Sequence, residues 1–298
     1  MFEPTDDVTI FGKLEYTKSR IAGSAFEFVP GGTRPDYRKN ADDAFSPVRD
    51  NAETLNGVIQ AEMAIGSHTL TAITGYSDYV YDQAFNTQAQ RPARLVVDNG
   101  EKFTQWSQET RLLSPTDGAF DYVVGAYVEV GKSRVRRQSI FDFPFPPSPD
   151  TQTFRIFNQK TNVIAVFAQG NLRIGDQFVL AAGLRWTQIK KRGDVTGFVR
   201  PGGGPPINRL PLFGNLTESD PSPSATLTWK PDRDASIYLK CAKGNKGGTL
   251  SELQNATAAT FILRPEKSTA FEFGAKAQIP SVGAFLNLAV FTTDYSDL

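Results

Sequence analysis

The stretch VIAVFAQGNLRIGDQFVLAAGLRWTQIK, residues 163–190, decides the fold. It divides into two arms, Val163 to Ile174 and Phe178 to Lys190, with Gly175-Asp176 as a tight turn between them. Apolar side chains recur at every second position of both arms: Ile164, Val166, Ala168, Leu172, Ile174, Phe178, Leu180, Ala182, Leu184 and Trp186. The intervening positions include Gln169, Asn171, Arg173, Arg185 and Thr187. This alternation predicts an antiparallel hairpin with one apolar and one mixed face.

The same pattern repeats along the chain. About eleven alternating segments can be counted: Val8 to Tyr16, Leu55 to Ile65, Thr69 to Tyr81, Phe103 to Leu113, Phe120 to Val135, Val163 to Ile174, Phe178 to Lys190, Ser224 to Lys230, Ser236 to Lys243, Thr269 to Ile279 and Ala284 to Tyr295. Several run to about ten residues or more, the length that a tilted strand needs to cross a bilayer, whereas strands of soluble proteins average about 5 to 6. The pattern favours an all-β, antiparallel transmembrane β-barrel.

The predicted connections alternate in length. The short ones carry turn residues: Gly66-Ser67, Pro115 to Gly118, Gly175-Asp176, Pro231 to Asp234 and Pro280 to Gly283. The long ones are rich in Gly, Pro, Asn and Asp: Thr17 to Thr54, Asp82 to Lys102, Arg136 to Asn162, Lys191 to Pro223 and Gly244 to Ser268. Strict alternation places all short turns at one rim and all long loops at the other, as in an outer-membrane barrel.

Composition excludes several classes of protein. The chain is 40% hydrophobic with a mean hydropathy of -0.32, and its apolar runs fall far short of the roughly 18 residues of a spanning helix. Its 32 basic and 32 acidic residues balance, so no basic field favours nucleic-acid binding. One cysteine, Cys241, and one histidine, His68, exclude an internal disulfide and argue against structural zinc.

The start of the chain, Met1 to Asp7, lacks the basic and apolar regions of a signal peptide. If the protein is exported, we expect its true N-terminus to be missing from this sequence.

Aromatic residues lie where interfacial girdles are expected. Phe120, Phe178 and Phe285 come just after short turns and Trp229 just before one, while Tyr16 and Trp186 lie toward the long loops. For any single residue, an ordinary role in core packing explains the position equally well.

No reaction or cofactor is expected from the sequence. The carboxylate pairs Asp42-Asp43 and Asp232 with Asp234 fall in predicted loops or turns, where solvation or an Asx turn is the simpler role. His68 adjoins a short turn and is interpreted as a rim residue. The run Gly202 to Gly204 has neither the lysine nor the strand-to-helix context of a phosphate loop.

Several local strings resemble the barrel of TonB-dependent outer-membrane receptors, especially the iron-siderophore type. They are QETRLLSP at 108–115, PEK at 265–267 followed by FEFGAK at 271–276, FTTDYSDL at 291–298, and AKG at 242–244 with KGG at 246–248. The resemblance runs over nearly the whole chain. Cys241 and Asn245 depart from it, standing where the family usually carries an aromatic or small residue.

The resemblance implies that residues 1–298 are a partial receptor barrel. The family's N-terminal plug domain and its energy-coupling box are absent from this sequence, and about eleven strands are half of a 22-stranded barrel. Because unpaired strand edges are costly in lipid, we expect a fragment of a longer protein, with strands missing after it. Expressed alone, it should aggregate or stay unfolded in detergent.

Polar residues on the predicted inner face are the candidates for ligand contact. They are Glu109, Arg111, Glu129, Arg185, Lys240, Glu272 and Lys276. The alternative role is a lattice of ion pairs that holds the strands or contacts a plug, and that role has the greater weight. Aromatics of the predicted long loops could also meet a chelate: Phe26, Phe28, Tyr37, Phe141, Phe143, Phe145 and Phe213.

The function that the resemblance implies is active uptake of a scarce, bulky solute, most simply a ferric siderophore, across the outer membrane of a Gram-negative bacterium. Its expected partners are outer-membrane lipid, the siderophore, and the TonB complex acting through the missing plug. Receptors for cobalamin, saccharides or other chelates share this architecture. Two alternatives stay open, a passive porin and a soluble cell-surface β-sandwich that binds a ligand.

Overall fold

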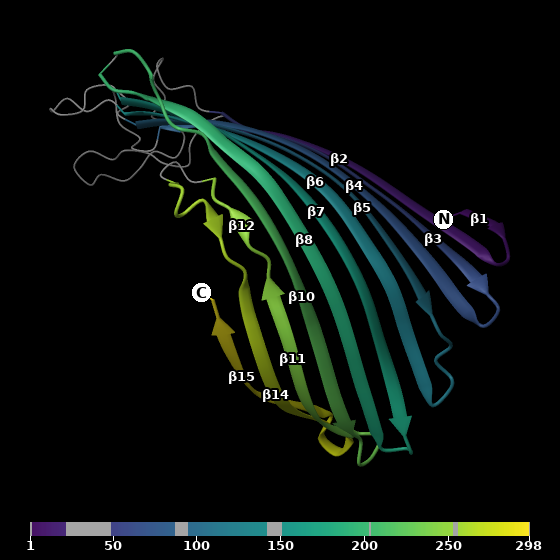
Figure 1. Cartoon of the computed structure of the whole chain (residues 1–298). Coiled ribbons are helices and arrows are strands. Elements are labelled where there is room, and N and C mark those ends of the chain that lie inside the picture. The colour runs from purple at the N-terminus through teal and green to yellow at the C-terminus, as the bar shows by residue number, and fades with distance from the viewer. Residues whose placement is uncertain are drawn as a thin grey trace.

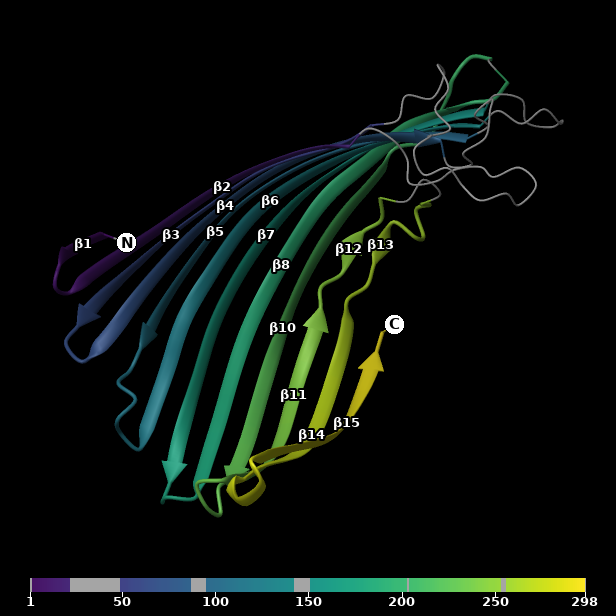
Figure 2. The same cartoon turned by 180° about the vertical axis from the view of Figure 1, so that it is seen from behind.

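The structure, a computed structural model, describes residues 2–21, 49–86, 95–141, 151–202, 204–252 and 256–297. These residues form one large antiparallel sheet that curls into an open trough (Figures 1 and 2). The described helical residues are those of one short 3-10 turn, Pro280–Val282, so none of them forms a helix able to cross a membrane.

Eleven long strands build the trough, which confirms the predicted number. Their bounds are β2 Val8–Ile21, β3 Arg49–Ile65, β4 His68–Asn86, β5 Leu95–Leu113, β6 Phe120–Phe141, β7 Thr151–Ile174, β8 Phe178–Arg200, β10 Leu212–Trp229, β11 Ala235–Lys246, β14 Glu266–Ile279 and β15 Ala284–Ser296. Four short strands were not predicted: β1 Phe2–Thr5, β9 Ile207–Asn208, β12 Thr249–Leu250 and β13 Ile262–Leu263.

The topology is an up-and-down meander. Each long strand pairs antiparallel with the next long strand in the chain, from β2 to β15. The short strand β1 pairs with β2 at one edge, and β9 pairs antiparallel with the end of β8. The two edges of the sheet face each other across the open side of the trough, and the strand labels of Figure 2 follow chain order from one edge to the other. A single curved sheet of this extent is not a β-sandwich.

The register confirms the two faces predicted from residues 163–190. Val166 pairs with Trp186 and Ala168 with Leu184, so the apolar residues of both arms share one face. The strand register continues this apolar face onto the neighbouring strands; for example, Val124 of β6 lies opposite Ala168. We call it the outer face, because the segment between β11 and β14 lies against the other face, the concave inner one.

The outer face carries an apolar belt of the height expected for a membrane. On β6 the belt runs from Phe120 to Val130 at every second position. These ten residue steps, at about 3.3 Å per residue and a tilt of about 40°, span about 25 Å, the height of the lipid-facing band of an outer-membrane barrel. Phe178 and Trp229 stack beside the short-turn rim, with ring centroids 6.4 Å apart.

The prediction that Phe285 belongs to the girdle was wrong. Phe285 pairs with Gln278 and so shares the inner face with Lys276. The cause is the 3-10 turn at Pro280–Val282, which sets the register of β15 so that Leu286 and Leu288 face outward instead.

The five predicted short turns are confirmed, and all lie at one rim of the trough (Figure 1). Gly66, Gly175 and Gly283 have φ values of 61°, 60° and 64°, which a glycine adopts at little cost. The sequence therefore fixes these reversals locally.

The predicted long connections were too long at both ends. The strands continue into them, so that β7 begins at Thr151 and β8 ends at Arg200, and the longest strand has 24 residues. Beyond the belt neither face carries apolar residues at every second position, while the hydrogen bonds of the ladder persist. Alternation, the signal used to find strands, is therefore lost before the strand ends.

Candidate functional site

The most organised part of the inner wall is a chain segment folded against it. Residues 247–265, here called the inner segment, connect β11 to β14 and carry the short hairpin of β12 and β13 (residues 253–255 are outside the described residues). Its side chains Leu250, Ala256 and Phe261 form a buried cluster with Val135, Phe157 and Val195 of strands β6, β7 and β8. The inner segment thus covers the extended part of the wall beyond the belt.

Polar contacts fix the inner segment to the wall from four strands. Arg137 of β6 pairs with Glu252 at 2.5 Å, and Arg155 of β7 donates from Nη2 to the Ala256 carbonyl at 3.2 Å. Around Gly248, Lys191 of β8 donates to the carbonyl at 2.7 Å and Glu218 of β10 accepts from the amide at 3.1 Å.

Two glycines of the wall make room for this packing. A Cβ at Gly193 would lie 2.8 Å from Leu250 and 2.4 Å from the Asn158 carbonyl. A Cβ at Gly214 would lie 2.6 Å from Leu250 and 3.0 Å from Phe261. The inner segment therefore approaches β8 and β10 more closely than any wall with side chains at these positions would allow.

Burial perturbs the charged groups beside the inner segment, all of which lie beyond the apolar belt. Burial raises the pKa of the Glu101 carboxyl, and the nearby charge of Glu252 adds to that rise. Burial also lowers the pKa values of Arg155 and Lys191. Each shift disfavours the charged form, so these contacts are made in surroundings drier than the open wall.

Four of the predicted inner-face residues lie together across β5 to β8. Arg111 Nη1 lies 3.7 Å from a carboxylate oxygen of Glu109. Tyr127, the residue opposite Glu109 on β6, donates a hydrogen bond of 2.6 Å to the Glu129 carboxylate. The guanidinium of Arg185 lies over the Tyr127 ring, 5.6 Å from its centroid. The result is a contiguous polar patch, much of it internally paired.

The other three predicted residues form a separate group. Lys240 of β11 lies opposite Glu272 of β14 in the strand register. The Glu272 carboxylate accepts a hydrogen bond from the Tyr238 hydroxyl. Lys276 lies apart, near the short-turn rim, beside Ser236. All seven residues are on the inner face, but they do not converge on one binding site. Whether any contacts a ligand stays a prediction.

Of the predicted loop aromatics, only two are described. Phe213 is 75% exposed in β10 on the outer face, opposite Asp194, so the prediction that it lies in a loop was wrong. The strand simply begins earlier than the alternation indicated. Phe141 ends β6 at an inner-face position, opposite Leu95. The remaining aromatics lie outside the described residues: Phe26, Phe28, Tyr37, Phe143 and Phe145.

The residues that hold the inner segment were not predicted. Arg137, Arg155 and Lys191 fell in segments interpreted as long loops. A usable signal was present, because Val135, Phe157 and Val195 are apolar at inner-face positions beyond the belt, where a water-filled lumen calls for polar residues.

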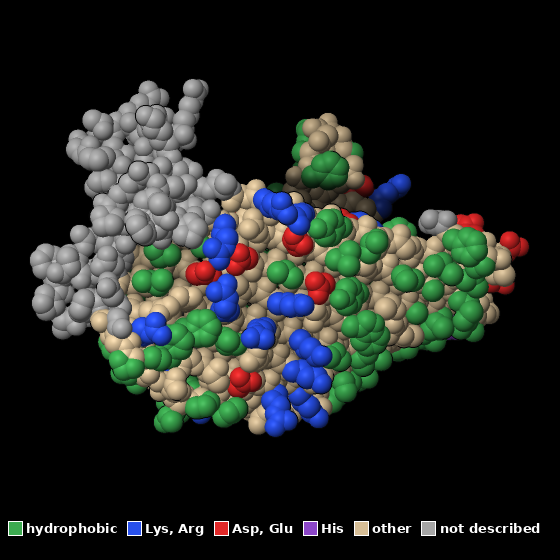
Figure 3. All heavy atoms as spheres, turned by 90° about the horizontal axis from the view of Figure 1, so that it is seen from above, with side chains coloured by type: hydrophobic (Ala, Val, Ile, Leu, Met, Phe, Trp, Pro, Cys, Tyr) green, Lys and Arg blue, Asp and Glu red, His purple; other side chains and the backbone are tan. Residues whose placement is uncertain are grey.

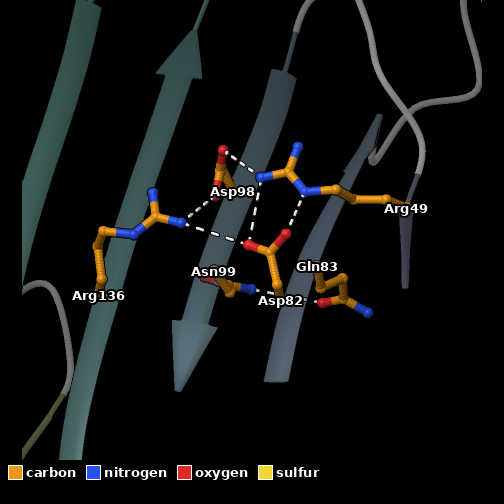
Figure 4. A network of polar contacts seen from close by, with 6 residues as sticks. All are labelled: Arg49, Asp82, Gln83, Asp98, Asn99 and Arg136. Carbon is orange, nitrogen blue, oxygen red and sulfur yellow. Dashed lines mark hydrogen bonds and ion pairs between the residues drawn. The ribbon is translucent and has the colours of Figure 1, made fainter. Parts of the chain in front are cut away.

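An ion-pair network lies on the outer face of the wall, beyond the apolar belt and so at the height of the inner segment on the other face (Figure 4). Arg49 contacts Asp82 at 2.5 Å and Asp98 at 2.9 Å, and Arg136 contacts Asp98 at 2.9 Å and Asp82 at 3.4 Å. The four residues come from β3, β4, β5 and β6, and Gly100 leaves space beside the Arg136 guanidinium. Each cation here has two carboxylate partners.

Other candidate chemistry is ordinary turn structure. The Asp234 amide donates to the Asp232 carboxylate at 2.8 Å, as predicted for an Asx turn, and His68 at the rim contacts the Tyr122 hydroxyl at 3.0 Å. Asp42 and Asp43 lie outside the described residues. Within the described part of the chain, no three His, Cys, Asp or Glu residues are grouped to hold a metal ion.

Comparison with known proteins matches this architecture. The family model described as "TonB dependent receptor-like, beta-barrel" matches residues 3–298. None of the curated proteins compared with the chain matches it.

Solved structures share the fold at low sequence identity. The ferric yersiniabactin uptake receptor FyuA of Yersinia pestis superposes with a TM-score of 0.76 at 17% identity, over 98% of this chain and 43% of that one. The ferric-catecholate import receptor Fiu of E. coli K12 gives 0.64 at 15%, over 97% and 49%. The siderophore receptor PiuA of Acinetobacter baumannii gives 0.63 at 14%, over 96% and 47%. This chain spans less than half the length of each.

Proposed function

The chain belongs to the TonB-dependent receptor-like β-barrel family, whose members are outer-membrane transporters, and from this membership we propose that it serves the uptake of a ferric siderophore. The match extends over residues 3–298, as the sequence resemblance predicted. The proposal carries no reaction and no resident cofactor.

The observation that carries the proposal is the contrast between the two faces of the trough. The outer face has an apolar belt of membrane height, whereas the inner face is mixed, with many polar residues, and bears the inner segment across its far end. A segment anchored inside a barrel narrows the passage, which supports a gated receptor over a wide passive porin.

We propose that the sheet is about half of a larger closed barrel. Within the described residues, the edge strands β1 and β15 have a strand partner on one side only. Unpaired backbone groups at such an edge cost several kcal/mol each in lipid, so closure by further strands is the arrangement that a membrane permits. In this scheme the TonB complex delivers energy through a plug domain inside the closed barrel.

The proposed ligand class, a ferric siderophore, is suggested by the names of the structural relatives, which are receptors for siderophores or their ferric complexes. Their identity to this chain is at most 17%, and that degree of likeness establishes the fold alone. The polar patch around Arg185 offers a stacked guanidinium and paired carboxylates that suit a polar, oxygen-rich chelate.

Uptake of radioactive iron tests the proposal. Cells carrying the full-length protein are grown under iron limitation and given ferric siderophores of the catecholate, hydroxamate and carboxylate classes. The expected result is saturable uptake of one class that stops when the proton-motive force is collapsed. Uptake that is linear in concentration and insensitive to energy would establish a porin instead.

Binding to the purified full-length protein tests the site. Arg185→Gln should weaken binding of the transported chelate, whereas Lys276→Gln, at the short-turn rim, should leave it unchanged. Equal affinities of both variants and the unaltered protein would assign Arg185 to the ion-pair lattice of the wall.

A further inference from the structure

Six cationic side chains lie together on the outer face, just beyond the apolar belt. We call them the outer basic band: Lys102, Lys132, Arg134, Lys160, Lys190 and Arg192. All are exposed. Figure 3, which looks onto this side of the sheet, shows Lys and Arg side chains gathered beside a broad apolar region.

The register brings these cations side by side. Lys132, Lys160 and Arg192 are direct neighbours on β6, β7 and β8. Lys102 pairs in the same way with Arg134 on the adjoining strands. Like charges directly opposite each other in a sheet repel and destabilise it. The band therefore concentrates positive charge at a cost to the isolated protein.

The described residues give the band no ion-pair partner. Among the described residues, no carboxylate lies within ion-pair distance of any of the six, whereas Arg49 and Arg136 on the same face have two each. Three acidic residues of the outer face lie one row from the band: Asp78 and Asp82 on β4, on either side of Lys102, and Asp194 beyond Arg192. Asp82 instead contacts Arg49 and Arg136, and the Asp194 carboxylate accepts a hydrogen bond from Asn158 at 3.1 Å.

The band lines a shallow groove of about 740 Å³. Five of the six cations border it, with Asp194 as the single acidic residue. The exposed Phe213 ring gives the groove an apolar edge. This combination of several cations, few anions and one aromatic suits an amphiphile with more than one negative charge.

The position of the band selects the occupant. Moving toward the short turns, the outer-face residues that follow are apolar within a few positions: Trp106 on β5, Val130 on β6, Ile164 on β7 and Trp186 on β8. A lipid whose chains lie along this belt places its headgroup phosphates at the height of the cations. A soluble anion gains nothing from this neighbouring apolar surface.

We propose that the outer basic band binds the phosphate groups of an anionic lipid in the outer leaflet. Lys and Arg clusters at the edge of a membrane-spanning surface attract such headgroups, and the attraction falls with ionic strength. The proposal rests on the membrane placement argued above and is independent of the transported ligand.

The test uses full-length protein in mixed micelles. The probes are a diphosphorylated glycolipid, its monophosphorylated form and phosphatidylcholine, with binding measured by fluorescence of labelled lipid at 50 and 500 mM NaCl. We expect affinity to decrease in that order and to fall with salt for the phosphorylated lipids only. Equal affinity for phosphatidylcholine, or no effect of salt, would overturn the proposal.

A triple variant, Lys132→Gln with Lys160→Gln and Arg192→Gln, should lower the affinity for the diphosphorylated lipid by on the order of tenfold or more. The matched control, Arg49→Gln with Arg136→Gln, removes paired cations of the same face and should cause a smaller loss. Unchanged affinity in the triple variant contradicts the proposal.

Two further measurements distinguish lipid binding by the band from misfolding and from binding of soluble anions. Heat-modifiable gel migration verifies that the variants are folded, and the salt titration of the unaltered protein does not depend on them. Displacement of the lipid by equimolar pyrophosphate would show that the groove is a site for soluble anions, against the proposal. Siderophore binding, measured in parallel, reports on the transport proposal separately.

Discussion

The two sides of the wall beyond the apolar belt use the same residue types in opposite ways. On β6, Arg136 belongs to the outer network while the adjacent Arg137 binds Glu252 of the inner segment. On β8, Lys191 contacts the inner segment, while its neighbours Lys190 and Arg192 point outward without a carboxylate partner among the described residues. On the inner face the cations hold the inner segment against the wall. On the outer face the cations of the outer basic band stay available to bind another molecule.

This difference shows that position in the strand, rather than residue type, decides what a charge does. Successive side chains of a strand face opposite sides, so a shift of one residue exchanges a structural ion pair for an exposed cation. The predictions below test this division between faces, beginning with the belt, where a change affects the stability of the whole protein.

The largest effect on the stability of the whole protein is expected from a charge placed in the belt. Ala168→Arg puts a cation near the middle of the outer face and should destabilise the folded protein by about 2–4 kcal/mol. Gln169→Arg, one residue along and exposed on the inner face, should have little effect. Urea titration of the full-length protein in vesicles measures both, and equal losses would contradict the assignment of the faces.

The next effect is confined to the docking of the inner segment and leaves the rest of the wall folded. Phe261 is 2% exposed, and Phe261→Ala should cost about 3–5 kcal/mol of docking energy, the usual loss for a buried phenylalanine. Ile262→Ala, at a residue that is 42% exposed, is the control. Hydrogen exchange of the Ser251 amide, which donates to the Phe261 carbonyl, should accelerate strongly in the first variant and slightly in the second.

A smaller effect is expected when the paired cations of the outer face lose their carboxylate partners. Asp82→Asn with Asp98→Asn removes the partners of Arg49 and Arg136 and so adds two unpaired cations beside the outer basic band. Affinity for the diphosphorylated lipid should rise by a few-fold. A fall in affinity in a folded variant would mean that the network, rather than the band, orders this surface.

The smallest effect is one of pH on the inner side. Because burial raises the pKa of Glu101 in the folded protein, its contribution to docking is most favourable at low pH and is lost as the pH rises through that raised value. Glu101→Gln should therefore make the inner segment slightly more resistant to protease at pH 7 and have no effect near pH 4. Glu101→Asp, which retains the charge, should not reproduce the gain.

The strands and their faces could be predicted because their causes are local. The hairpin of Val163 to Lys190 carries both its alternation and its turn in consecutive residues, and the structure confirms the two arms and their apolar face. Phe285 and Phe213 were placed wrongly where a turn or a strand end depends on hydrogen bonds to neighbours. The inner segment was missed because Leu250 and Phe261 pack against residues more than fifty positions away.

The sequence by itself determined the meander, the apolar belt and the family, because alternation and turn residues act between adjacent positions. Only the tertiary structure decided which charges meet. Arg137 reaches Glu252 because the chain returns across the trough, and Lys132, Lys160 and Arg192 become neighbours because three strands pair in one register. Both outcomes depend on contacts between distant residues, which no local pattern contains.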